Sequence, residues 1–218
     1  MLKKTTRVLL LKHPYIQELL TVLRDKNTPC HVFRNCLEEM GIFIAYEISR
    51  DLDFEEITVK TPLGVASGFR LRDPVVLIGI LRAALPMVYG MLRVFKKAQI
   101  GVVAARRIEE AGSRNNDFMV EIPYEREPDL NDKVVIIADP MIATASTIVR
   151  IISRIKGRWQ PKKIIVAAII GSKFGVERLI KEHPDVLLYI TAVDEKLNEH
   201  GYIVPGLGDA GDRAFCTE

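Results

Sequence analysis

The chain has 218 residues, of which 48% are hydrophobic and 27% charged, and its formal net charge is +3. This composition is typical of one globular domain with a sizeable core, and the charge is too small to predict a nucleic-acid partner. No run of about 18 apolar residues is present, so we expect no membrane-spanning helix, and the N-terminus does not resemble a signal peptide. We therefore expect a single domain over 1–218, located in the cytoplasm, with no membrane partner.

Apolar periodicity divides the chain into alternating helices and strands. In chain order, the expected elements are helices 14–24 and 31–50, a strand pair at 56–60 and 65–70, strand 75–79, helix 84–95, strand 100–105, strand 134–138, helix 146–156, strand 163–169, helix 173–182 and strand 186–190. This order predicts an α/β fold with a doubly wound parallel sheet. In such sheets, ligands bind beyond the carboxyl ends of the strands.

The segment 134–152, VVIIADPMIATASTIVRII, predicts a buried strand, a short turn and a helix. The turn holds one carboxylate, Asp139, and three hydroxyls, Thr144, Ser146 and Thr147. Unpaired N–H groups and partial positive charge at a helix start favour a phosphate there. The alternative is an ordinary strand–turn–helix unit with a hydroxyl as N-cap. The chain has no G-x-x-x-x-G-K-[ST] or G-x-G-x-x-G motif, which gives no support to a nucleoside triphosphatase or a dinucleotide fold.

Two further arginines follow apolar strands. Arg82 lies in the turn of VVLIGILRAALPM (75–87), where a guanidinium can bind a pyrophosphate through two parallel hydrogen bonds. Arg107 follows the strand GVVAA, beside Arg106. A solvated arginine at a strand end is the alternative interpretation of each.

The C-terminal segment 198–213, NEHGYIVPGLGDAGDR, contains four glycines and Pro205, so neither a regular helix nor a central strand is expected. Such a backbone can approach a ligand closely. A frayed tail is the alternative. Against it, the apolar residues Tyr202, Ile203, Val204 and Leu207 are able to dock on the domain.

These motifs together resemble the type I phosphoribosyltransferases. The turn after 134–138 resembles their loop for 5-phosphoribosyl-1-pyrophosphate (PRPP), and DPM-x-AT (139–144) resembles the uracil phosphoribosyltransferase branch. GYI-x-PGLGDAGDR (201–213) is similar to the uracil-recognition loop of that branch almost letter for letter. The resemblance covers the chain from about residue 12 to the C-terminus. It implies the type I fold with N-terminal helices, a flexible hood or β-arm at about 106–130 and a base-recognition loop at 198–213.

The resemblance also implies a role for each motif. The expected catalytic residues are Arg82, Arg107 and Asp209. The residues expected to bind PRPP are Arg82, Arg107, Asp139, Pro140, Met141, Ile142, Ala143, Thr144, Ala145, Ser146, Thr147 and Asp209. Those expected to bind uracil are Ile203, Gly208, Asp209 and Ala210, with Asp209 also near Mg²⁺ carried by PRPP.

The activity implied is transfer of the 5-phosphoribosyl group from PRPP to uracil, with Mg²⁺, giving UMP and pyrophosphate in pyrimidine salvage. The resemblance further implies a homo-oligomer, dimer or tetramer, with the N-terminal helices as candidate interface. GTP is a possible allosteric effector because some relatives respond to it. Two other functions remain open: a nucleotide sensor that binds nucleic acid through its basic N-terminus, and an enzyme of this fold acting on another base.

The chain departs from the family pattern at the PRPP loop. Most bacterial members have two glycines where this chain has Ala145 and Ser146. A positive φ costs such residues about 1 kcal/mol. Either these positions are already helical, or the loop has a different shape. Alanine in place of glycine also stiffens the unfolded chain, which favours stability.

The cysteines at 30, 36 and 216 are widely spaced and odd in number. We therefore expect free thiols in a reducing compartment.

Overall fold

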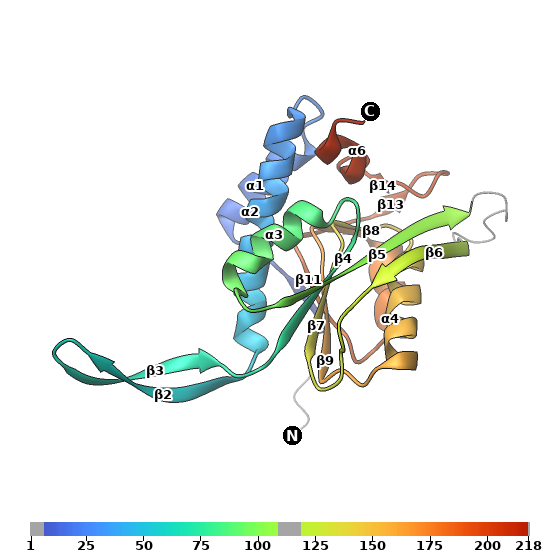
Figure 1. Cartoon of the computed structure of the whole chain (residues 1–218). Coiled ribbons are helices and arrows are strands. Elements are labelled where there is room, and N and C mark those ends of the chain that lie inside the picture. The colour runs from blue at the N-terminus through green and yellow to red at the C-terminus, as the bar shows by residue number, and fades with distance from the viewer. Residues whose placement is uncertain (1–6, 109–118, 218) are drawn as a thin grey trace, which may run out of the picture.

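The computed structural model describes residues 7–108 and 119–217. Its centre is a seven-stranded sheet in the order β1-β11-β9-β7-β4-β5-β6, parallel except for β6, which runs antiparallel to β5 (Figure 1). The strands are β1 (Val8–Leu10), β4 (Val75–Leu81), β5 (Gln99–Ile108), β6 (Met119–Arg126), β7 (Val134–Ala138), β9 (Lys163–Ala167) and β11 (Leu187–Ile190). The expected doubly wound parallel sheet is confirmed.

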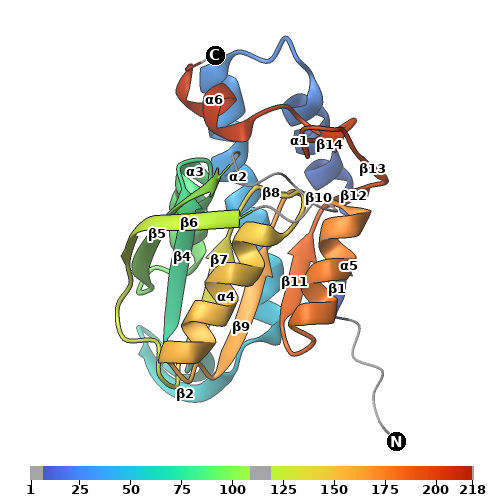
Figure 2. The same ribbon diagram turned by 90° about the vertical axis from the view of Figure 1, so that its right-hand side faces the viewer.

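Helices cover both faces of this sheet. One core cluster contains residues of α1 (Pro14–Arg24), α2 (Cys30–Ile48) and α3 (Leu85–Val94), and the other contains residues of α4 (Ser146–Arg158) and α5 (Lys173–Glu182). Figure 2 shows α4 and α5 in front of the strands. Neighbouring residues of one strand enter opposite clusters, as Val76 and Leu77 do, because side chains alternate along a strand. Strands buried on both faces explain the continuous apolar runs in the sequence.

Three small sheets extend the fold. Strands β8 (Met141–Ile142), β10 (Ile170–Ser172) and β12 (Ala192–Asp194) form a parallel sheet beyond the main strands, and β13 (Lys196–Leu197) pairs with β14 (Ile203–Val204). Strands β2 (Phe54–Thr61) and β3 (Gly64–Leu71) form a hairpin that projects from the body of the molecule (Figure 1). The short helix η1 (Ser49–Asp51) precedes this hairpin.

The structure differs from the expectations at both termini. Strand β1 lies in the basic N-terminal stretch, where no strand was expected, and pairs in parallel with β11. At the other end, the segment expected to exclude a regular helix contains α6 (Ala210–Phe215). Three of the four glycines precede it and Gly211 lies in its first turn, and the Asp209 side chain caps the helix by accepting a hydrogen bond from the Asp212 N–H at 3.0 Å.

The expectation of three free thiols is wrong. Cys30 and Cys216 form a disulfide across 186 positions of sequence, and only Cys36 is free among the described residues. The bond joins the start of α2 to the residue after α6, and so fixes the C-terminus to the body of the domain.

In the part of the chain that the structure describes, no helix combines the length and apolar character needed to cross a membrane.

Candidate active site

The turn between β7 and α4 surrounds a small cavity of about 160 Å³. Its lining comprises Asp139 and the run from Met141 to Ile148. Pro140, which the sequence placed in the same site, does not line the cavity; its carbonyl accepts the N–H groups of Ile169 and Ile170 instead. The structure therefore brings all the other residues expected in this loop together around one cavity at the start of a helix, where anions are favoured.

Ala145 and Ser146 adopt different conformations. Ala145 has φ of +61° and ψ of 3°, which is left-handed, whereas Ser146 is the first residue of α4. Ser146 is therefore helical, which is one of the two expected outcomes, whereas Ala145 fits neither outcome because it is not helical and keeps a positive φ. A glycine would adopt the Ala145 conformation without strain.

Arg82 lies in the turn immediately after β4 and reaches toward the C-terminus. Its Nη2 donates to Asp212 Oδ1 at 2.6 Å and to Thr217 Oγ1 at 3.0 Å, and its guanidinium lies 5.8 Å from the Phe215 ring centroid. A Cβ built on Gly211 would lie 3.6 Å from Arg82 Nε and 3.1 Å from Asp209 Oδ1. The expected pyrophosphate residue is thus adjacent to the base-recognition loop.

The segment expected to recognise the base, 198–213, is folded against the domain. Ile203 and Ala210 are buried, Gly208 has a positive φ of 78°, and Asp209 is exposed at the start of α6. The four residues expected to contact uracil therefore lie on one short segment that includes β14 and the cap of α6.

Two ionic groups outside the predicted site residues hold this loop. Arg24 donates to both carboxylate oxygens of Asp194, at 2.6 and 2.8 Å, and to the Gly206 carbonyl at 2.8 Å. Asp194 also accepts the Gly206 N–H at 3.0 Å. Burial raises the pKa of Asp194, but the hydrogen bonds from Arg24 and Gly206 outweigh burial and leave this pKa below its usual value.

The second group is Arg213, the last residue of the 198–213 segment. Its guanidinium donates to the carbonyls of Leu23, Asp25 and Leu207 at 2.5–2.6 Å and lies 4.2 Å from the Phe33 ring centroid. Arg24 and Arg213 thus fasten the loop to α1 and to the turn after α1.

Comparison with known proteins supports one family. The family model described as uracil phosphoribosyltransferase matches residues 10–217. A uracil phosphoribosyltransferase of Metallosphaera sedula is 45% identical over 213 residues, covering 95% of this chain and 99% of the relative. One from Thermococcus gammatolerans is 42% identical over 205 residues, covering 93% and 89%.

The chain belongs to the uracil phosphoribosyltransferase family.

Solved structures share the fold of this chain. The AQ2163 protein from Aquifex aeolicus is similar with a TM-score of 0.87 and 33% identity, covering 97% of this chain and 99% of that one. A hypoxanthine phosphoribosyltransferase from Staphylococcus aureus matches with a TM-score of 0.52 and 10% identity over 74% of each chain. The second likeness shows only that this uracil phosphoribosyltransferase family member has a fold shared with other phosphoribosyltransferases.

The expected hood is only partly described. Its central residues 109–118 lie outside the described part of the chain, as does the side chain of Arg107, although the Arg107 backbone pairs with Val120 in the β5–β6 ladder. Arg106 pairs with Glu121 at the surface, at 2.7 Å, in agreement with its interpretation as a surface charge.

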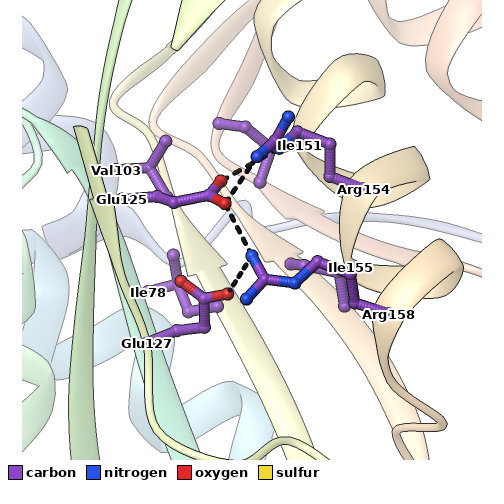
Figure 3. A pocket seen from close by; sticks show the side chains of 8 residues that line it. All are labelled: Ile78, Val103, Glu125, Glu127, Ile151, Arg154, Ile155 and Arg158. Atoms are coloured by element: carbon purple, nitrogen blue, oxygen red, sulfur yellow. Dashed lines mark hydrogen bonds and ion pairs between the residues drawn. The ribbon is translucent and has the colours of Figure 1, made fainter. Parts of the chain in front are cut away.

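A second hollow, beside α4, is filled by ion pairs rather than open to a ligand. Figure 3 shows Arg154 and Arg158 of α4 facing Glu125 and Glu127 at the end of β6. Hydrogen bonds from Arg154, together with Arg158, hold the pKa of Glu125 below its usual value even though burial acts in the opposite direction. The open volume is about 10 Å³, so we assign these pairs a structural role, which is to fix the hood strand β6 to α4.

Proposed function

We propose that the protein transfers the 5-phosphoribosyl group of PRPP to uracil, producing UMP and pyrophosphate for pyrimidine salvage. The observation that carries this proposal is the Arg82–Asp212 ion pair of 2.6 Å. It joins the turn expected to hold pyrophosphate to the helix that ends the base-recognition loop. Substrates bound by these two segments and by the phosphate loop would meet at one edge of the sheet.

Each segment has a distinct task in this proposal. Backbone N–H groups and hydroxyls of 143–147 bind the 5′-phosphate, and Asp139 accepts hydrogen bonds from the ribose hydroxyls. Main-chain groups of Ile203, Gly208 and Ala210 pair with the polar edge of uracil. Pyrophosphate then leaves the anomeric carbon as uracil N1 attacks and the N1 proton is released to solvent, and the reaction needs no covalent enzyme intermediate. Arg82 and Arg107 neutralise the charge that develops on the leaving group.

The oxygen donors of the candidate site are suited to a Mg²⁺ ion that is carried by PRPP. The described residues contain no group of three or more metal-ligating side chains. Mg²⁺ is commonly held by one or two carboxylates together with substrate phosphates, and the exposed carboxylate of Asp209 meets that need beside Arg82. When bound with PRPP, the ion supplies further neutralisation of the departing pyrophosphate.

The direct test is ultraviolet detection of UMP from uracil, PRPP and Mg²⁺, with cytosine, orotate and hypoxanthine as parallel substrates. Product from uracil alone is the expected result. Product from another base would indicate a different branch of the fold. If no base reacts while PRPP still binds in calorimetry, the chain is a sensor instead.

Arg82→Ala should lower turnover by about a hundredfold or more, because a preorganised donor to the leaving group is lost. Arg93→Ala is the matched control: Arg93 is an exposed arginine on α3 that pairs with Glu38 at 2.6 Å. Its turnover should equal that of the parent protein. An unchanged rate for Arg82→Ala would remove this residue from the mechanism.

We also propose a homo-oligomer, dimer or tetramer, but through the β2–β3 hairpin rather than the N-terminal helices. The hairpin exposes Leu63 fully, Val65 at 71% and Phe69 at 75%. Exposed apolar side chains gathered on one projecting element are typical of protein interfaces. Leu63→Ser with Phe69→Ser should lower the mass measured by light scattering, whereas Lys60→Ser on the same hairpin should not. An unchanged mass for the double variant would exclude the hairpin.

GTP as an allosteric effector and a cytoplasmic location remain proposals. The first is supported by the family resemblance, and is tested by titrating GTP into the uracil assay. A disulfide does not argue against the second, because intracellular disulfides occur, above all in hyperthermophilic organisms.

A further inference from the structure

Helix α5 supports the phosphate loop at three points. The Ser172 hydroxyl donates to the Ala143 carbonyl at 2.5 Å and accepts the Gly175 N–H at 2.8 Å. A Cβ on Gly175 would lie 2.3 Å from the Ala143 carbonyl oxygen, so the helix start and the loop are in close contact. The third point is Arg178, one turn further along α5. The starts of α4 and α5 lie at the same end of the molecule (Figure 2).

Arg178 contacts the two residues on either side of the left-handed Ala145. Its Nη1 donates to the Thr144 carbonyl at 3.3 Å and to Ser146 Oγ at 3.0 Å, and its side chain is only 19% exposed. One guanidinium nitrogen therefore binds both sequence neighbours of Ala145, the residue with the left-handed backbone. The contact to Oγ requires the serine hydroxyl, so a glycine at 146 would not make it.

The direction of these hydrogen bonds orients the Ser146 hydroxyl. Arginine has no acceptor, so Ser146 Oγ accepts the hydrogen bond from Arg178. Thr144 Oγ1 lies 3.1 Å from Ser146 Oγ, and both residues line the phosphate cavity. Arg178 thereby places a positive charge behind the loop and fixes the Ser146 hydroxyl at the wall of this cavity.

We propose that Arg178 is a positioning residue for PRPP, acting on the 5′-phosphate through Ser146 and the Thr144 carbonyl. This inference rests on the proposed assignment of the 139–147 turn as the PRPP loop. It gives a reason for the serine at 146: the lost glycine is replaced by a hydroxyl that α5 holds in place.

The test is a double-variant cycle with Arg178→Gln and Ser146→Ala, measured as KM for each substrate and as calorimetric affinity for PRPP. Each single variant should raise the KM for PRPP about tenfold while the KM for uracil stays within about twofold, since a hydrogen bond to a charged group is lost only at the phosphate. The double variant should be less affected than the product of the two single effects. Fully multiplicative effects would show that Arg178 does not act through Ser146.

Two controls separate positioning from general stability. Glu182→Gln removes a partner of Arg178 outside the loop, a carboxylate 2.8 Å from Nε, and should leave both KM values unchanged. Arg178→Lys retains the positive charge but not the planar guanidinium with its fixed donors. Its PRPP affinity should therefore lie between that of the parent protein and that of Arg178→Gln. A purely structural role for Arg178 would instead lower the thermal midpoint and impair both substrates equally, and this outcome would overturn the proposal.

Thr147→Val tests the loop itself, because Thr147 lines the cavity and belongs to a different helix from Arg178. If it weakens PRPP while Arg178→Gln does not, Arg178 has no positioning role and the loop assignment stands. If none of the variants changes PRPP affinity, the loop assignment itself is wrong.

Discussion

Ala145 shows how a single residue sets the shape of the phosphate loop. Its left-handed backbone costs an alanine about 1 kcal/mol, and its methyl group is buried at 5% exposure. Burial of a methyl group contributes about 0.8 kcal/mol in the opposite sense. The net effect of the alanine on the free energy of unfolding is therefore close to zero. The stabilisation that an alanine can bring by stiffening the unfolded chain is not expected here, because it requires a conformation that alanine adopts without strain.

This balance predicts that two substitutions of Ala145 have different effects on stability. Ala145→Gly should unfold in urea with a free energy within about 1 kcal/mol of the parent and should keep its PRPP affinity. Ala145→Val should lose about 2 kcal/mol or more and bind PRPP more weakly, because a β-branched residue is strongly disfavoured at positive φ. Equal stability of the two variants would mean that the loop does not hold a left-handed residue here.

At the scale of elements, the base-recognition loop depends on groups distant in sequence. Arg24 and Asp194 are 170 positions apart, yet their ion pair holds Gly206 by both its N–H and its carbonyl. Local periodicity does not link the two residues, and their pairing follows only from the contact of α1 with the edge of the small β8–β10–β12 sheet. Arg82 and Asp139, by contrast, were predictable because each directly follows a buried parallel strand.

Asp194→Asn should therefore destabilise the protein by about 2 kcal/mol and raise the KM for uracil, because the amide cannot accept both hydrogen bonds from Arg24. The lowered pKa of Asp194 also determines how its contribution to the stability of the protein depends on pH. An aspartate with a lowered folded pKa stabilises the protein above its unfolded pKa of about 3.9, and this contribution is lost as the pH falls through the folded pKa.

Urea unfolding of the parent protein and of Asp194→Asn between pH 7 and 2 checks this prediction. The difference in unfolding free energy should be constant near neutral pH and shrink below about pH 4. Glu195→Gln is the control, since Glu195 pairs with Lys173 at the surface and is 75% exposed. A difference that persists unchanged at pH 2 would show that the ionised carboxylate is not what stabilises the loop.

At the scale of the whole molecule, the layered α/β architecture followed from sequence because its strands are apolar runs separated by amphipathic helices. Three features did not follow. Strand β1 has only three residues and lies in a basic stretch, α6 begins within a glycine-rich segment, and the Cys30–Cys216 disulfide joins cysteines without a spacing motif. Each is decided by what the segment packs against in the folded chain, which local periodicity does not report.

The disulfide links global stability to the active site, because Cys216 directly follows the helix whose Asp212 binds Arg82. Breaking a bond that closes so long a loop should cost about 2–4 kcal/mol. It should also raise the KM for uracil by releasing the end of α6. Mild reduction, followed by thermal unfolding and the uracil assay, measures both effects.

Thiol titration and two variants make this test specific. Burial, with a smaller contribution from Glu39, raises the pKa of Cys36 to about 12, so this thiol should not react while the protein is folded at neutral pH. The folded, oxidised protein should therefore show no reactive thiol, and the unfolded, oxidised protein one. Cys216→Ser should have the lower midpoint already and be insensitive to reductant, whereas Cys36→Ala should respond to reductant as the parent does. Three reactive thiols in the unfolded protein without reductant would mean that the disulfide does not form.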